Sequence, residues 1–509
     1  MAESQEPVLR FLADPATHGL SAPVGRIDTA NAIVFLAGPD VYKVKRAVQY
    51  PYMDLSTLEK RRSACESEIA VNRDNAPSLY LGTVPIVAEG DAFRIGGAGD
   101  AVEWAVHMRR FDEEATLDKV AERGELDEAI IDRLAAAIRR SHERAPRRDG
   151  AGTTQSLEIY IGQNDDAFAE RPGLFPEPQA RRLTQDMRAA FAIARPVLLR
   201  RGAEGFTRRC HGDLHLRNIA LIDGEPVLFD AVEFSDAIAS GDVLYDLAFL
   251  LMDLEERGLR RFANRLLNRY LAPEPPGAID GLSALPLFLS LRAAIRAKVD
   301  AAGADRMEGP RRDEAFARAR HYFDLACALI RYSAPRLVAT GGLSGAGKSA
   351  LASRIAPFLG RAPGALWLRS DVERKLMLGV PEHAPAPASA YAPEVTREVY
   401  RRIDEKARRG LQAGQAVLLD ATFSAARERK AASAIAAELG VPFDGLFLDA
   451  SVGTRVARVS GRRADASDAD AEVARRQRAE PLAERGWRAL DAEGSLDETE
   501  ALARRRLML

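Results

Sequence analysis

Hydrophobic and polar residues change their spacing several times along the chain, and each change indicates a different element. Residues 31–48, NAIVFLAGPDVYKVKRAV, alternate around a Gly-Pro-Asp turn, which predicts a β-hairpin. Residues 58–76 and 125–144 repeat apolar positions at helical spacing, whereas VEWAVHMRRF at 102–111 predicts a strand. Residues 210–234 then predict a loop followed by two strands joined by a DGEP turn.

The pattern becomes regular in the second half of the chain. Residues 242–333 are almost wholly helical apart from the proline-rich break PEPPG at 273–277. After Pro335, short apolar strands alternate with helical sequence, and the strands lie at 336–342, 365–371, 416–422 and 443–450. Such alternation predicts a parallel, doubly wound sheet. We therefore predict two domains, a mixed α+β domain at residues 1–333 and a doubly wound α/β domain at 334–509.

The composition of the chain limits the kinds of molecule that it is expected to bind. The formal net charge is −2, from 72 basic and 74 acidic residues, so charge gives no general attraction to nucleic acid or to an anionic membrane. The three cysteines are widely spaced, which predicts reduced thiols in a cytoplasmic protein. The acidic N-terminus lacks the apolar core of a signal peptide. The apolar stretch at 245–254 is too short to span a bilayer. Oligomeric state stays open.

A glycine-rich loop follows the strand at 336–342. Gly342, Gly347, Lys348 and Ser349 fit the pattern G-x-x-x-x-G-K-[ST], with Gly345 as a further glycine inside the loop. Glycines let backbone amides face phosphate oxygens, and the following helix adds its positive end. Lys348 would bridge the β- and γ-phosphates of ATP, and Ser349 would ligate Mg²⁺. A chance glycine loop is the alternative.

Two strand ends beyond this loop carry acidic residues. LRSDVERK places Asp371 where it could accept the proton of an attacking hydroxyl, and Arg374 where it could hold the acceptor or the phosphoryl group. Asp371 could instead only cap the following helix. Asp420, in LLDATF, could orient Mg²⁺. A mobile lid would carry the arginines of RVARVSGRR over the phosphates, namely Arg458, Arg462 and Arg463, although a solvated helix explains them nearly as well.

Residues 336–509 resemble the P-loop small kinases related to gluconate kinase, polynucleotide kinase and the zeta-toxin kinases. The resemblance rests on GLSGAGKS, SDVERK and LLDATF. In that group the aspartate of the SD-x-x-R position works as the base, which maps onto Asp371, and the matching arginine is Arg374. The resemblance does not choose among sugars, nucleic-acid ends and other hydroxyl acceptors.

A second set of polar residues lies in the first domain. In CHGDLHLRNI, Asp213 and Asn218 have the D-x-x-x-x-N spacing in which the aspartate meets a hydroxyl and the asparagine reaches Mg²⁺. VLFDAVEF supplies Asp230 as a further metal ligand. Upstream, VYKVK supplies Lys43, preferred over Lys45, for the α- and β-phosphates. The ion-pair partner of this lysine is predicted at Glu68, with Glu66 as the alternative.

HGDLHLRN with FDAVEF resembles the aminoglycoside phosphotransferase family, which has the bilobal protein-kinase-like fold. The resemblance covers about residues 31–330. It implies that backbone groups at 104–108, in VEWAVHMRR, meet adenine, and that residues 242–333 form the helical acceptor lobe. No G-x-G-x-x-G loop precedes Lys43. His211 is expected to support the loop, and the role of His215 is left open. The domain order also resembles a bacterial group that fuses such a phosphotransferase to a P-loop ATPase.

The leading hypothesis is a bifunctional ATP- and Mg²⁺-dependent kinase in which each half phosphorylates a hydroxyl of a small metabolite. A second hypothesis makes the first domain a nucleotide-binding module that regulates a single active P-loop kinase. A third directs the P-loop half to nucleic-acid ends or nucleotide-sugars, and the balanced charge offers no obvious surface for binding a nucleic-acid strand. Neither the acceptors nor a preference for ATP over GTP follows from the sequence.

Overall fold

The computed structural model describes residues 5–50, 53–90, 92–461 and 466–509. Its contacts form two compact units. The first consists of Met1–Thr153 with Gly202–Leu247, and the second of Thr154–Arg201 with Ala248–Leu509. The predicted architecture, a kinase-like N-terminal region followed by a C-terminal parallel sheet, is confirmed. The predicted domain boundary between residues 333 and 334 stays a prediction.

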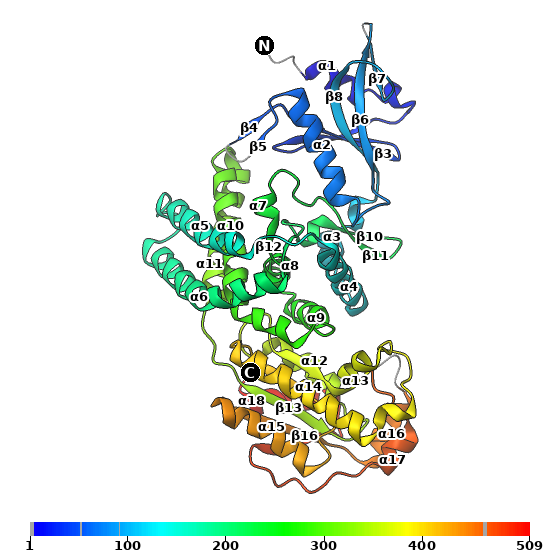
Figure 1. Ribbon diagram of the computed structural model, residues 1–509, viewed down its shortest axis with the longest axis vertical. Coiled ribbons are helices and arrows are strands. Elements are labelled where there is room, and N and C mark those ends of the chain that lie inside the picture. Colours follow the sequence, from blue (N-terminus) through cyan, green and yellow to red (C-terminus); the bar gives the residue numbers. More distant parts are fainter. Residues whose placement is uncertain (1–4, 51–52, 91, 462–465) are drawn as a thin grey trace. The chain divides into compact units, whose positions relative to one another are not determined.

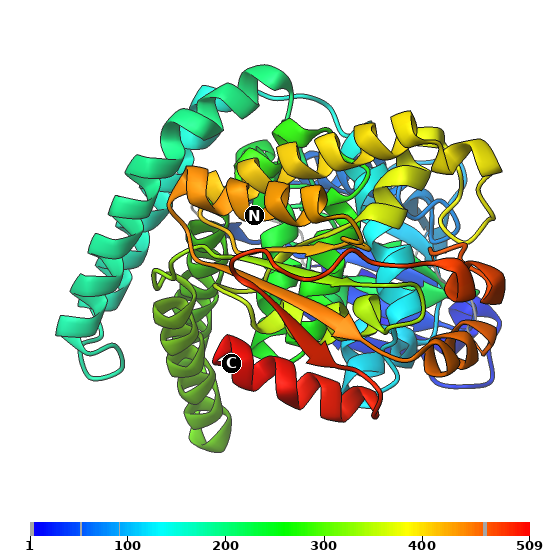
Figure 2. The same ribbon diagram turned by 90° about the horizontal axis from the view of Figure 1, so that it is seen from below.

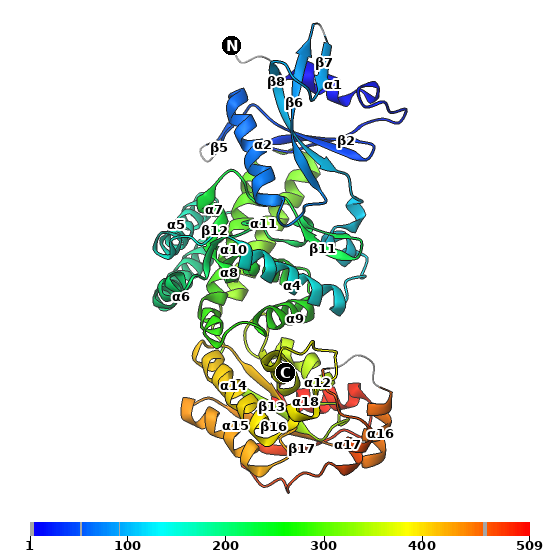
Figure 3. The same cartoon turned by 45° about the vertical axis from the view of Figure 1, so that its right-hand side comes forward.

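A six-stranded antiparallel sheet dominates the first unit (Figure 3). In spatial order its strands are β1 (Gly25–Asp28), β2 (Ala32–Ala37), β3 (Asp40–Lys45), β8 (Ala101–Arg109), β6 (Tyr80–Glu89) and β7 (Ala92–Ile95). The predicted hairpin is β2–β3, and Gly38 turns it with a φ of 60°. Helix α2 (Leu58–Asn72) packs on this sheet, and its N-cap residue is Thr57, whose side chain accepts a hydrogen bond from the Lys60 amide.

The remainder of the first unit carries the polar loops that follow. The predicted second hairpin is β10 (Ile219–Ile222) with β11 (Glu225–Leu228). Asp223 and Gly224 turn it with φ values of 52° and 79°, the left-handed pair that tight hairpins require. The other elements are α1 (Glu6–Ala13), α3 (Leu117–Glu122), α4 (Glu128–Arg144), β9 (Thr207–Arg209), α7 (Asp236–Ala239) and β12 (Ser240–Asp242), with the short pair β4 (Gln49–Tyr50) and β5 (Met53–Asp54).

Long helices form the first part of the second unit, as the pattern of residues 242–333 predicts. They are α5 (Gly150–Ala169), α6 (Glu177–Glu204), α8 (Val243–Glu256), α9 (Arg260–Leu271), α10 (Leu285–Ala304) and α11 (Gly309–Leu329), of which the first three begin or end in the other unit. Among the described residues one helical stretch, Pro276–Ala304, is long and apolar enough to cross a membrane. The protein buries 83% of its most apolar window, which is typical of a core helix.

Five parallel strands form the C-terminal sheet, in the order β14 (Leu366–Arg369), β15 (Val417–Asp420), β13 (Leu337–Gly342), β16 (Phe443–Asp449) and β17 (Trp487–Asp491). Helices cover both faces, as Figure 2 shows with α14 and α15 in yellow and orange and α18 in red. The helices are α12 (Lys348–Ile355), α13 (Ser370–Leu378), α14 (Pro393–Gln412), α15 (Ala426–Leu439), α16 (Val452–Ser460), α17 (Ala471–Arg476) and α18 (Leu496–Leu507). Strand C-termini therefore meet at one edge, where such sheets bind ligands.

A partly buried carboxyl on α14 makes stability depend on pH. Burial raises the pKa of Asp404 from 3.8 to about 6, while the positive charge of Arg408 opposes the shift. The folded chain therefore binds this proton more tightly than the unfolded chain. Its contribution to stability is complete below the unfolded pKa and is lost as the pH rises through the folded pKa.

Asp404→Asn is therefore expected to stabilise the protein at pH 8 by about 1 kcal/mol, less than the full shift implies because the carboxyl is partly exposed. At pH 3, below the unfolded pKa, the variant and the parent should unfold together, since both side chains are then mostly neutral in the folded and in the unfolded chain. Differential scanning calorimetry at the two pH values measures the effect. A variant that unfolds at a lower temperature at pH 8 would contradict it.

Candidate active sites

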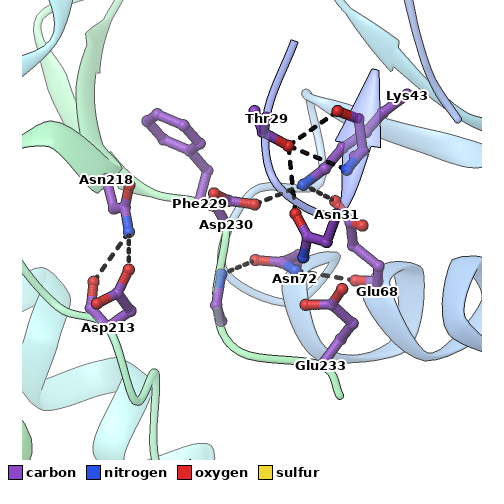
Figure 4. A network of polar contacts seen from close by, with 12 residues as sticks. Thr29, Asn31, Lys43, Glu68, Asn72, Asp213, Asn218, Phe229, Asp230 and Glu233 are labelled. Atoms are coloured by element: carbon purple, nitrogen blue, oxygen red, sulfur yellow. Dashed lines mark hydrogen bonds and ion pairs between the residues drawn. The ribbon is translucent and has the colours of Figure 1, made fainter. Parts of the chain in front are cut away.

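In the first unit, two predicted carboxylates contact the predicted lysine. The Nζ atom of Lys43, on β3, lies 2.9 Å from Oε1 of Glu68 and 2.7 Å from Oδ1 of Asp230 (Figure 4). Burial alone would lower the pKa of Lys43, but the carboxylates of Asp230 and Glu68 outweigh burial and raise it well above its ordinary value. The protonated amine of Lys43 therefore links the strand β3, the helix α2 and the loop that carries Asp230.

Lys45, the alternative to Lys43 in the sequence, pairs with the same predicted glutamate, so both lysines contact Glu68. Lys45 lies two residues along β3, with its Nζ 2.6 Å from Oε2 of Glu68 and in contact with Glu233. The side chains of Lys45 and Glu68 are fully buried. Burial would raise the pKa of Glu68, but the two lysines lower it to about 2. Glu66, the alternative partner, is exposed and pairs with Arg62 instead.

The two polar loops that carry the other predicted residues are bonded to each other. Asn218 donates from Nδ2 to Oδ2 of Asp213 at 3.1 Å (Figure 4). The Phe229 amide donates to the Asn218 carbonyl at 3.0 Å. His211 contacts the Phe229 carbonyl through Nε2 at 2.9 Å, which is the loop-supporting role expected of it. His215 Nε2 lies 3.4 Å from Oδ2 of Asp213.

A buried aspartate on α8 holds the loop before Asp213. Asp246 accepts hydrogen bonds from the amides of Gly212, at 2.8 Å, and His211, at 3.3 Å. His142 of α4 lies 3.1 Å from the same carboxylate. Sequence reasoning missed both side chains. The only signal in the sequence was an aspartate inside the apolar run YDLAFLL. An aspartate in such a run is expected to be buried, and a buried carboxylate needs hydrogen-bond partners.

The backbone at Asp230 takes a left-handed conformation that its neighbours fix. Its φ is 59°. Its amide donates to the hydroxyl of Tyr80 at 3.1 Å, and the next amide, of Ala231, donates to Oδ1 of Asn72 at 2.8 Å. The carboxylates of Asp230 and Asp213 are 46% and 41% exposed. Carboxylate and amide oxygens are ligands that Mg²⁺ prefers, so Asn218 and Asp230 fit a magnesium–triphosphate.

The predicted adenine-binding segment at residues 104–108 requires a correction. These residues lie inside β8, which pairs with β3 along one edge and with β6 along the other. A strand with neighbours on both sides has its backbone groups committed to the sheet. The pairing continues past the end of the strand, since the Arg110 amide donates to the Pro39 carbonyl at 2.8 Å.

The phosphate-binding loop of the second unit has the predicted strand–loop–helix setting. β13 ends at Gly342 and α12 begins at Lys348. Gly342, Gly345 and Gly347 have φ values of 137°, 85° and 95°, which favour glycine. A Cβ atom on Gly345 would lie 2.3 Å from the Arg455 carbonyl oxygen, so the loop has room for glycine only. Such a loop of backbone amides fits a phosphate group.

Asp420 lies beside this loop at the end of β15. Ser349 hydrogen-bonds its carboxylate, which also lies 3.3 Å from Nε1 of Trp367 and 3.7 Å from Nε of Arg369. Burial raises the pKa of Asp420, while the charges of Arg369 and Lys348 oppose that rise. The predicted ligands Ser349 and Asp420 are thus brought together, and a hydroxyl beside a carboxylate fits Mg²⁺.

Asp371 and Arg374 both belong to α13. The helix begins at Ser370 after an N-cap residue, Arg369, so Asp371 lies in its first turn rather than at the cap. Burial is the largest cause of the raised pKa of Asp420, and the charge of Asp371 adds to it. Arg374 is buried and donates from Nη1 to the Ala390 carbonyl at 2.7 Å. This contact holds the segment before α14, and the predicted role of Arg374 at the phosphoryl group stays a prediction.

The predicted lid is described only in part. Arg458, in the last turn of α16, donates from Nη1 to the Ala346 carbonyl of the phosphate-binding loop at 3.5 Å and from Nη2 to the Gly494 carbonyl at 2.7 Å. Arg462 and Arg463 lie outside the described residues. Gln477, which sequence reasoning missed, accepts a hydrogen bond through Oε1 from the Ser344 amide of the loop at 2.8 Å.

Comparison with known families finds two matches along the chain. Residues 94–282 match a family described as the phosphotransferase enzyme family, and residues 337–482 match one described as an AAA domain. Uncharacterised proteins of Mycobacterium tuberculosis and Mycobacterium bovis are each 30% identical to this chain over 454 residues, which is 88% of this chain and 88% of theirs. Asp213 and Asp371 lie inside the matched ranges, whereas Lys43 and Glu68 precede them.

Solved structures resemble separate parts of the chain. A choline/ethanolamine kinase family protein from Mesorhizobium loti is 14% identical, covers 64% of this chain and 98% of its own, and has a TM-score of 0.34. The APS kinase of Mycobacterium tuberculosis is 21% identical, with coverage of 35% and 99% and a TM-score of 0.27. A gluconokinase from Sinorhizobium meliloti is 22% identical, with coverage of 35% and 95% and a TM-score of 0.25.

Proposed function

Because the chain belongs to the same family as its mycobacterial relatives and joins a phosphotransferase region to an AAA domain of the kinase type, we propose that it is a bifunctional kinase. Each half transfers the γ-phosphate of ATP to a hydroxyl group of a small molecule. The observation that carries this proposal is the charge cluster of the first site. Lys43, Glu68 and Asp230 meet at 2.9 and 2.7 Å beside the loop of Asp213 and Asn218. A domain that only regulates would not require all five of these residues.

In the first site, Lys43 binds the α- and β-phosphates and Asp213 accepts the proton of the attacking hydroxyl. Asn218 and Asp230 hold Mg²⁺. In the second site, the amides of the glycine loop and Lys348 bind the phosphates, Ser349 and Asp420 hold Mg²⁺, and Asp371 accepts the hydroxyl proton. Bound Mg²⁺ neutralises charge on the triphosphate and fixes its oxygens.

The acceptors are proposed to be small molecules, without a nucleic-acid or membrane partner, since the net charge of −2 gives no general attraction to polyanions. A candidate of a different kind keeps only the P-loop site active and uses the first unit as a nucleotide-binding regulator. The two proposals differ in whether loss of the first site removes any phosphorylated product.

Two measurements on the full chain separate these proposals. Calorimetric titration with a non-hydrolysable ATP analogue and Mg²⁺ is expected to find two sites in the parent protein. One site should remain after Lys348→Ala and one after Asp230→Asn. Transfer from γ-labelled ATP is then screened over sugars, polyols, amino alcohols and an oligonucleotide, and each variant should lose a different product. Loss of every product on Lys348→Ala, with none lost on Asp230→Asn, would favour the regulatory module. No transfer to any acceptor would contradict both.

A further inference from the structure

The strand that leads to Asp371 lies at the edge of its sheet. β14 pairs with β15 along one side, and the described residues provide no strand on its other side. A buried strand edge leaves backbone amides and carbonyls that need hydrogen-bond partners. Here the partners come from a helix that lies outside the matched AAA range.

Helix α9 supplies two asparagine side chains to this edge. Asn268 donates from Nδ2 to the Ala365 carbonyl at 3.1 Å and accepts through Oδ1 from the Trp367 amide at 2.7 Å. Asn264 donates to the same carbonyl at 3.0 Å. The Asn268 amide therefore makes the two bonds that one residue of a neighbouring parallel strand would make. Both asparagines are almost fully buried, with 2% of the surface of Asn264 and 8% of that of Asn268 exposed.

Further contacts fix α9 against the sheet and its helices. Lys406 of α14 donates to the Ala272 carbonyl at the end of α9, at 3.1 Å, and to Oε2 of Glu373 at 2.7 Å. Arg269 pairs with Glu382. The cavity that remains among α9, β14 and α13 has a volume of only about 50 Å³. Figure 1 shows α9 beside α12, in agreement with their contacts. A helix packed this closely transmits its position to the strand.

The strand that α9 holds also carries the groups beside the second active site. Trp367 and Arg369 reach Asp420 from β14, at 3.3 and 3.7 Å, and Asp371 follows the strand directly. A shift of β14 would therefore move Asp371 and the two side chains that contact Asp420. Small displacements of reacting groups reduce rates strongly, by about 100-fold for 1 Å.

We propose that α9 is a positioning element of the P-loop site, and that Asn268 sets the place of β14 and hence of Asp371 and of the side chains that contact Asp420. This inference rests on the proposed kinase function of that site. The helix lies within the range matched by the phosphotransferase family, residues 94–282, yet completes the sheet of the other domain. The P-loop site is thus built from both matched regions.

The test compares Asn268→Ala with Asn164→Ala in the full chain. Asn164 is a matched control because it is 1% exposed on α5, and within the described part of the chain its side chain makes no hydrogen bond. Asn268→Asp is a second variant, which keeps the acceptor for the Trp367 amide and loses the donor to the Ala365 carbonyl. Deuterium exchange of the peptide at 364–372 is measured together with the phosphate transfer that Lys348→Ala removes.

We expect Asn268→Ala to speed exchange at 364–372 and to lower kcat at the P-loop site by about 10- to 100-fold, with the affinity for ATP changed by less than about 3-fold. Asn268→Asp should do the same at least as strongly, because it buries a carboxylate against the Ala365 carbonyl, and Asn164→Ala should leave both readouts unchanged. Faster exchange with an unchanged kcat, or unchanged exchange, would overturn the proposal. If the parent protein shows no Lys348-dependent transfer, the proposed function fails, and the exchange data alone then decide whether Asn268 holds the strand.

Discussion

The Asp213→Asn variant is expected to lose phosphate transfer at the first site by about 100- to 10,000-fold while it still binds the triphosphate. Asp213 is 41% exposed and lies 3.1 Å from the Asn218 amide, so an asparagine can keep the shape of the loop but cannot accept the hydroxyl proton. The measurement pairs transfer from γ-labelled ATP with calorimetric titration of an ATP analogue.

The control is Asp223→Asn in the turn of the neighbouring hairpin. Asp223 is exposed and has a φ of 52°, which asparagine tolerates, so this variant should keep the parent rate. If Asp213→Asn retained full transfer to an acceptor that Asp230→Asn abolishes, Asp213 would not be the base. Loss of triphosphate binding in Asp213→Asn would assign it to binding instead.

Glu68→Gln is expected to lower the free energy of unfolding of the first unit by about 3–5 kcal/mol. The glutamate is fully buried between Lys43 and Lys45, and a neutral amide would leave two buried ammonium groups with one carboxylate partner each. Differential scanning calorimetry of the full chain should show the transition of the first unit at a much lower temperature, with that of the P-loop sheet little changed.

Glu66→Gln is the matched control on the same helix. Its carboxylate is 53% exposed and pairs with Arg62 across one helical turn, an interaction worth about 0.3–0.5 kcal/mol. The two variants should therefore differ clearly in melting temperature. Equal destabilisation by both would mean that the buried cluster adds little to stability.

The residues of the first site could be predicted because their order along the chain is informative. Lys43, Glu68 and Asp230 are far apart in sequence, yet the strand, helix and loop that carry them follow from local periodicity. Lys45 and Glu233 were missed as a pair, since alternate residues of a strand look alike until the partner that faces them is known. Asp246 was missed for a related reason, because its partners are backbone amides.

The second site likewise has one part that the sequence could predict and one part that it could not. The glycine loop is a local structure, so its strand, helix and backbone angles follow from consecutive residues. The contacts of Arg374 with Ala390, and of Asn268 with Trp367, depend on tertiary packing that no local spacing encodes. A division of the chain at residues 333 and 334, placed where the periodicity changes, would separate α9 from the edge of the sheet that it completes.

The backbone around Asp230 has a consequence for inhibitor design. Displacing this segment would break the hydrogen bonds to Tyr80 and Asn72 and the ion pair with Lys43. Compounds that require the segment to swing outwards should therefore meet a large energetic barrier in this enzyme. Ligands that bind with this segment in its present position and compete directly with the nucleotide are a better starting point.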